Sequence, residues 1–123
     1  MRDLTVNLQN KPGTVAQAAE ALGNAGINIE GVFGMAMGDR GELHLLVADA
    51  AVARSALQAA GADCGADRDV EVVSLVDEPG ELGRHLRRIA DAGVNLDMAY
   101  TATNTRLVVA AADMDALRRA MHG

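Results

Sequence analysis

Apolar residues in the first 26 positions follow two different spacings. Leu4, Val6 and Leu8 alternate with polar residues, which is the period-two pattern of a half-buried strand. Pro12 and Gly13 then break this pattern. From there the apolar positions recur at helical spacing, at Val15, Ala18, Ala19, Leu22 and Ala25. We therefore predict a helix over about 13–25, ended by Gly26, whose missing side chain permits a left-handed backbone.

The rest of the first half predicts a hairpin and a second helix. Residues 27–37 are rich in β-branched, aromatic and Met side chains, residues 38–41 form a turn, and the apolar positions from 43 to 47 alternate again. Asp49 is expected to cap a helix over 50–60 that ends at Gly61. Residues 62–66 follow as a closing fourth strand.

The second half predicts the same elements in the same order. A strand over 71–76 is followed by a loop over 77–80 and a helix that ends at Gly93. The buried positions expected for this helix are Leu82, Leu86, Ile89 and Ala90. Strands over 94–101 and 106–111 form a hairpin, and Asp113 caps a last helix that continues to about Met121. No comparable strand follows, so the second half is one edge strand short.

The two halves are copies of one module. A shift of 67 residues places Val6–Glu30 over Val73–Asp97 without a gap, and 7 of these 25 positions are identical. The identities include both residues of each Pro-Gly pair, the Gly before the second strand and the Asn after it. Because the matches fall where the elements begin and end, we infer an internal duplication.

This motif resembles the ACT domain, a small amino-acid-sensing module. The resemblance lies in the first strand, the Asn-or-Asp, any residue, Pro, Gly loop, the helix, and the Ala-Gly-apolar-Asn-apolar-acid segment. The whole chain is similar to free-standing tandem ACT proteins. The resemblance implies an α+β fold of two ferredoxin-like βαββαβ modules, 1–67 and 68–123. Each would have an antiparallel sheet with helices on one face, and the second would lack or shorten its last strand.

The resemblance also implies where a ligand would bind. In related ACT sites the Asn two residues before the Pro and the Asn after the second Gly contact a ligand held at an interface between modules. These positions are Asn10 and Asn28 in the first copy and Asp77 and Asn95 in the second. The candidate site residues in the segments around them are Lys11, Pro12, Gly13, Thr14, Val15 and Ile29, with Gly80 and Leu82 in the second copy.

Elementary chemistry supports a carboxylate site at the first loop. The start of a helix offers free N–H groups and the positive end of the helix dipole, and Gly13 has no side chain to cover them. The amide of Asn10 can donate to a carboxylate and accept from an ammonium group. The second loop carries Asp77, Glu78 and Glu81, three acids that repel an anion. We therefore expect the first loop to hold the ligand carboxylate.

Composition excludes several classes of function. The formal charge of −6 and two aromatic residues, one Phe and one Tyr, argue against nucleic-acid binding. One cysteine forms no internal disulfide, and no apolar run approaches the roughly 18 residues that cross a bilayer. We expect a cytoplasmic protein that binds neither membrane nor nucleic acid. The three His residues have no metal-ligand spacing and form no recognisable catalytic set, so we expect no metal, no cofactor and no enzymatic activity.

The sequence thus predicts a non-catalytic regulatory protein. It would bind a free amino acid or a similar small carboxylate metabolite between ACT modules and signal by allostery or oligomerisation. We expect a homodimer, because exposed sheet edges are commonly closed by association. Three alternatives stay open: a detached regulatory subunit of a biosynthetic enzyme, like the small subunit of acetohydroxyacid synthase; a transcriptional co-regulator without its own DNA-binding domain; and a ligand-free dimerisation scaffold.

Overall fold

A computed structural model describes residues 1–122 of the chain, and these divide into two compact units. The first unit is Met1–Arg68 and the second begins at Asp69. The elements of the first unit are β1 (Arg2–Gln9), α1 (Thr14–Asn24), β2 (Gly31–Met37), β3 (Arg40–Val47), α2 (Ala50–Ala59) and β4 (Asp63–Asp69). Those of the second unit are β5 (Glu71–Ser74), α3 (Glu81–Asp91), β6 (Leu96–Ala102), β7 (Arg106–Ala111) and α4 (Met114–His122).

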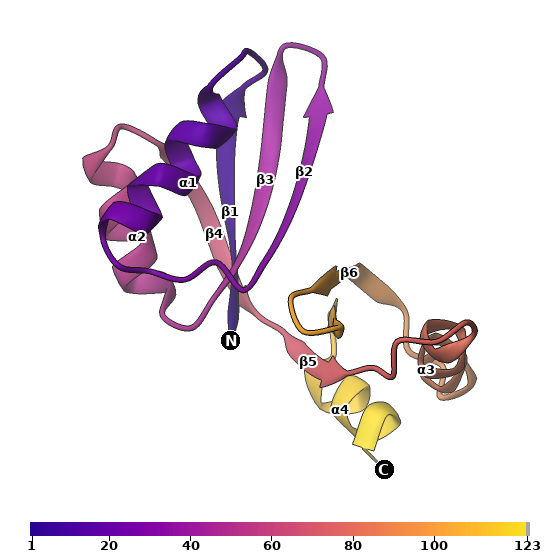
Figure 1. The fold of residues 1–123 in the computed structure, drawn as a ribbon. Coiled ribbons are helices and arrows are strands. Elements are labelled where there is room, and N and C mark those ends of the chain that lie inside the picture. Colours follow the sequence, from indigo (N-terminus) through magenta and orange to yellow (C-terminus); the bar gives the residue numbers. More distant parts are fainter. Residues whose placement is uncertain (123) are drawn as a thin grey trace. The chain divides into compact units, whose positions relative to one another are not determined.

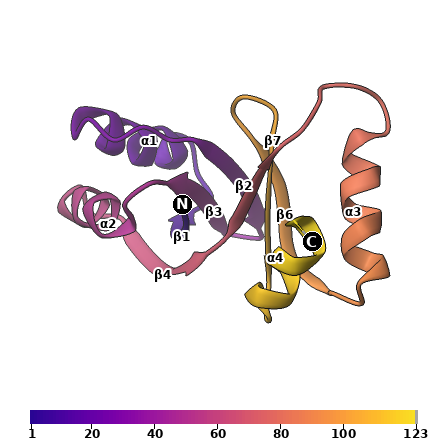
Figure 2. The same ribbon diagram turned by 90° about the horizontal axis from the view of Figure 1, so that it is seen from below.

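The first unit is a four-stranded sheet with two helices on one face (Figures 1 and 2). The strand order is β2-β3-β1-β4, and β3 pairs antiparallel with both β1 and β2. The alternating residues Leu4 and Val6 point into the core, where they pack with Leu22 of α1 and Leu57 of α2. This is the predicted βαββαβ order with an antiparallel sheet.

The second unit repeats this plan with one strand fewer. Its sheet has the order β5-β7-β6, with β7 antiparallel to both neighbours. Its core contains Ile89 of α3, Leu107 and Val109 of β7, and Leu117 of α4. Within residues 69–122 no strand takes the place that β4 holds beside β1, so one edge of β5 is unpaired there. The predicted fold, including the missing edge strand, is confirmed.

The predicted glycine stops end three of the helices. Gly26, Gly61 and Gly93 all have positive φ values, of 73°, 85° and 77°. In each case the next residue donates its N–H to the last turn of the helix, as Ile27 does to the carbonyl of Leu22 at 2.9 Å. This is the Schellman arrangement, which satisfies carbonyl groups that a helix end leaves free. Asp49 caps α2 as predicted, accepting from the N–H groups of Ala51 and Val52.

The structure corrects two details of the prediction. The strand expected over 27–37 begins only at Gly31, because residues 27–30 form an extended connection whose Ile27 and Ile29 pack against the core. The helical apolar stripe is also narrower than predicted. Val15 is 54% exposed and Leu82, its counterpart in the second unit, is 40% exposed. Both lie in the first turn of a helix, where the side chain projects beyond the edge of the core. Three further positions of the predicted stripes are also exposed: Ala19, Ala25 and Ala90.

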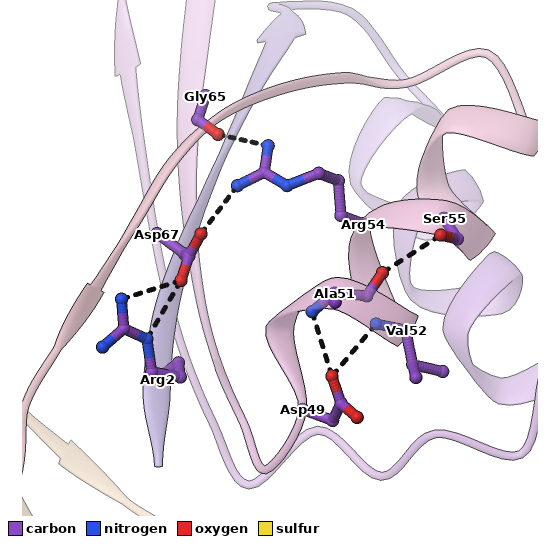
Figure 3. Close-up of polar contacts among 8 residues, drawn as sticks. All are labelled: Arg2, Asp49, Ala51, Val52, Arg54, Ser55, Gly65 and Asp67. Atoms are coloured by element: carbon purple, nitrogen blue, oxygen red, sulfur yellow. Dashed lines mark hydrogen bonds and ion pairs between the residues drawn. The ribbon is translucent and has the colours of Figure 1, made fainter.

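A shared carboxylate ties β4 to two other elements of the first unit (Figure 3). Asp67 accepts from Arg2 Nε of β1 at 3.0 Å and from Arg54 Nη2 of α2 at 2.9 Å. Arg54 also donates to the carbonyl of Gly65 at 2.6 Å. These hydrogen bonds lower the pKa of Asp67 below its ordinary value. The network therefore holds β4 most strongly while Asp67 is ionised.

Asp67→Asn is expected to destabilise the first unit modestly and to change its pH dependence. A lowered pKa in the folded state means that ionised Asp67 stabilises the fold above its ordinary pKa and loses this contribution as pH falls through the lowered value. We expect a loss of about 1 kcal/mol or less at neutral pH, since the three side chains stay partly exposed to water. The difference between the two proteins should become smaller as pH falls below the ordinary pKa of Asp67. Denaturant unfolding at pH 7 and pH 3 measures it, and an equal difference at both values would contradict this role.

Candidate functional site

The β1–α1 loop leaves the start of a helix open. Gly13 precedes α1 with φ 93° and ψ −15°, and no side chain caps the N–H groups of the first turn. A Cβ atom placed on Gly13 would meet nothing within 4 Å. Thr14 closes the loop instead, because its Oγ1 donates to the carbonyl of Gln9 at 2.9 Å and lies 3.1 Å from that of Lys11. The open helix start predicted from sequence is present.

Asn10 fixes the position of this loop. Its Nδ2 donates to the carbonyl of Gly38 at 2.9 Å, and its backbone N–H donates to that of Asp39 at the same distance. Both acceptors lie in the turn between β2 and β3. One side-chain N–H of Asn10 is therefore used within the protein, which leaves its second N–H and its amide oxygen.

Asn28 and Ile29 lie at the opposite end of the first unit from this loop. Helix α1 runs from the loop to the connection over 25–30, as Figure 1 shows. The strand register agrees, because Gln9 is paired with Arg40 beside the hairpin turn whereas Gly31 is paired with Leu46 near the start of β1. Strand β1 alone spans about 23 Å at roughly 3.3 Å per residue. One amino acid therefore cannot touch Asn10 and Asn28 of the same unit.

The equivalent loop of the second unit is covered. Gly80 has nearly the same backbone as Gly13, with φ 91° and ψ −13°. Arg84, however, bonds Glu78 at 2.9 Å and Glu81 at 2.7 Å. Its Nη1 lies 3.3 Å from where a Cβ of Gly80 would be. The hydrogen bond from Arg84, followed by that from His85, lowers the pKa of Glu81.

This arrangement changes the reason why the second loop is a poor anion site. From sequence we expected three repelling acids, but Arg84 pairs with two of them. Its guanidinium instead occupies the space in front of the helix. Asp77 and Asn95 are exposed, and by the repeat they occupy the places of Asn10 and Asn28. The counterpart of Arg84 in the first unit is Gln17, which has no such charge.

A hollow of about 620 Å³ lies beside the open loop of the first unit. Of the first-unit residues predicted for the site, Lys11 and Thr14 line it, and the others do not: Asn10, Pro12, Gly13, Val15, Asn28 and Ile29. Its wall also includes Gln17 of α1, Arg40 and Glu42 of β3, and Asp63 at the start of β4. These four residues could not be predicted from the sequence, because only folding brings their segments together. Its size lies within the range of small-molecule sites.

The charged residues of the hollow differ in their partners. Glu42 Oε1 lies 2.7 Å from His44 Nε2, while His44 Nδ1 lies 2.9 Å from Asp3 Oδ1. The hydrogen bond to Asp3 is the main cause that raises the pKa of His44, and that to Glu42 adds to it. In contrast, the side chains of Lys11, Arg40 and Asp63 form no hydrogen bond or ion pair within residues 1–122.

Other chemistry receives little support from the described residues. Within residues 1–122 no group of three or more His, Cys, Asp or Glu side chains is placed to hold a metal ion. Burial raises the pKa of the Cys64 thiol, which keeps it protonated and weakly nucleophilic at neutral pH. No helix in this part of the chain is long and apolar enough to cross a membrane.

Comparison with known proteins identifies the fold. No family model matches the chain, and no curated protein is significantly similar to it in sequence. Among solved structures, protein BT0572 from Bacteroides thetaiotaomicron superposes with a TM-score of 0.85 at 26% identity, over 97% of this chain and 84% of that one.

Two further structures are regulatory subunits of aspartate kinase. The ligand-free subunit from Thermus thermophilus has a TM-score of 0.72 at 23% identity, covering 98% of this chain and 89% of its own. The subunit from Thermus flavus has a TM-score of 0.70 at 22% identity, covering 98% and 90%. At this identity the likeness shows the fold alone, two βαββαβ-like modules with antiparallel sheets.

Proposed function

We propose that this chain is a non-catalytic, cytoplasmic regulatory protein that binds a free amino acid or a similar small carboxylate at the β1–α1 loop of its first unit. The observation that carries the proposal is the uncovered start of α1 at Gly13, which opens beside a ligand-sized hollow with an unpaired Lys11 in its wall. The fold shared with regulatory subunits supports the regulatory role.

The loop suits a carboxylate for physical reasons. The first N–H groups of α1 have no side-chain cap, and the helix dipole places partial positive charge there. Lys11 adds a full positive charge at the same end. Binding regulates only if the ligand favours one arrangement of the protein over another. The affinity of the loop for its ligand must therefore differ between the two arrangements.

A thermal-shift screen of the twenty amino acids tests this proposal. An amino acid at about 100 times its dissociation constant stabilises the folded state by roughly 2.7 kcal/mol, which moves the midpoint by several degrees. Lys11→Ala should reduce the shift, while Arg87→Ala on exposed α3 should leave it unchanged. A flat screen would overturn ligand binding and favour the scaffold alternative.

We also propose that the chain forms a homodimer through β2. This strand is at the edge of the first sheet and carries no charge over Gly31–Met37. Phe33, Met35 and Met37 are 44–50% exposed on one face of it. Uncharged apolar edge strands are the ones that pair with another chain, and antiparallel pairing of two identical β2 strands satisfies a twofold axis.

Met35→Lys is expected to convert the dimer to a monomer. A charge beside the centre of β2 would be buried against the apolar strand of the copy and near the same charge on that strand, which disfavours pairing. The monomer should keep its fold, because Met35 is half exposed. Multi-angle light scattering measures the mass, and Val52→Lys, at a similarly exposed position on α2, is the control. An unchanged dimer in the Met35 variant would place the interface elsewhere.

The second candidate function is a detached subunit of a catalytic chain. The aspartate kinase subunits of the same fold favour it, because they are regulatory chains named as parts of an enzyme. Affinity purification from the native cell separates the two functions. Recovery of a biosynthetic enzyme in equal amounts supports the subunit, and recovery of this protein alone supports the free sensor.

A further inference from the structure

Three charged side chains from three segments line the hollow of the first unit without a partner. Lys11 comes from the β1–α1 loop, Arg40 is the first residue of β3, and Asp63 is the first residue of β4. None of them lies within 4.0 Å of an opposite charge in the described part of the chain. The two cations and the acid therefore form no ion pairs with one another across the hollow.

This differs from the rest of the first unit, where nearby opposite charges pair. Arg2 and Arg54 both bond Asp67, and Glu42 bonds His44. Glu42 also lines the hollow but bonds His44, so the charged lining side chains without a hydrogen bond or ion pair within residues 1–122 are two positive and one negative. The start of α1 adds partial positive charge on the side of Lys11.

The complement of this set is a molecule with two negative groups and one positive group. We infer that the hollow binds an acidic α-amino acid, with one carboxylate at Lys11 and the start of α1, the second at Arg40, and the ammonium at Asp63. The planar guanidinium of Arg40 can hold a carboxylate by two parallel hydrogen bonds. The inference rests on the proposed function and adds the ligand class and two residues, Arg40 and Asp63, from outside the loop.

Calorimetry of the full chain with L-glutamate, L-aspartate and their amides, L-glutamine and L-asparagine, tests it. Replacing the second carboxylate by an amide removes one charge-assisted contact, so we expect binding to weaken by about tenfold or more. Arg40→Gln should remove this preference for the acid over the amide. Asp63→Asn should weaken the binding of all four amino acids. It should also allow N-acetyl-L-glutamate, which lacks the ammonium group, to compete with L-glutamate for the hollow.

Two charge-matched variants serve as controls. Arg87→Gln and Asp91→Asn remove the same charges from exposed α3 in the second unit and should leave the four affinities unchanged. The Arg40 and Asp63 variants are expected to fold, since neither side chain has a partner to lose, and thermal midpoints verify this.

The outcomes separate this inference from the function on which it rests. The inference is supported if the acidic amino acids bind more tightly than their amides and if Arg40→Gln loses this preference. Tighter binding of a neutral or basic amino acid, or an unchanged preference in Arg40→Gln, overturns the ligand class and leaves the proposed function standing. Binding of none of the twenty amino acids overturns both.

Discussion

Leu22→Ala is expected to destabilise the first unit by about 3 kcal/mol, and Ile89→Ala to destabilise the second unit by a similar amount. The two residues occupy the same position of the repeat, 67 apart, and are 0% and 1% exposed. Each packs into a separate core, Leu22 with Leu4 and Leu57, and Ile89 with Leu107 and Leu117. Truncation removes buried methyl groups and leaves a cavity that such a small core cannot fill.

Hydrogen exchange tells which unit each substitution affects. Because the cores share no residue, Leu22→Ala should speed amide exchange in β1 and β3 and spare β7, and Ile89→Ala should do the opposite. This would support our proposal of two modules that meet near residue 68. Simultaneous loss of protection in both units would instead indicate one cooperative domain.

The repeat provides matched controls for this pair. Val15 and Leu82 also occupy equivalent positions, and both remain about half exposed. Their replacement by Ala should cost well under about 1 kcal/mol, because little surface is buried there. A large cost at Val15 would mean that the start of α1 is covered by something beyond the first unit.

The elements of the fold could be predicted because their limits depend on local chemistry. A glycine that follows a helical apolar stripe, such as Gly26 or Gly93, ends the helix in a left-handed conformation, and alternation in β1 specifies a half-buried strand. The exposure of Val15 could not be predicted, because helical spacing does not show how far the sheet beneath the helix extends. The four-residue delay of β2 arises from pairing with β3, a contact between different segments.

The candidate site was predictable only in part. Pro12 and Gly13 mark the open helix start, because they lie on one loop in the sequence. Arg40 and Asp63 were missed, since nothing near them in the sequence signals a ligand and only folding brings them to Lys11. The role of Arg84 was missed for a related reason. The sequence shows the charge of Arg84, but it does not show that the side chain reaches back over Gly80.

The comparison of the two loops gives a second large expected effect. Thr14→Glu together with Gln17→Arg reproduces in the first loop the Glu81 and Arg84 pair of the second. The new guanidinium should cover Gly13, so we expect the affinity for L-glutamate, or for whichever amino acid gives the largest thermal shift, to fall by at least about tenfold.

Fold stability should change little in this double variant. A Glu at the start of α1 favours the helix dipole and an i,i+3 pair with Arg, which offset the loss of the two Thr14 hydrogen bonds. Calorimetry gives the affinity and thermal unfolding the stability. Gln58→Ala, at an exposed position of α2 outside the lining of the hollow, is the control and should bind within about threefold of the unmodified protein. The double variant covers the helix start with a guanidinium. If it still binds the amino acid with full affinity, the helix start at Gly13 does not hold the ligand.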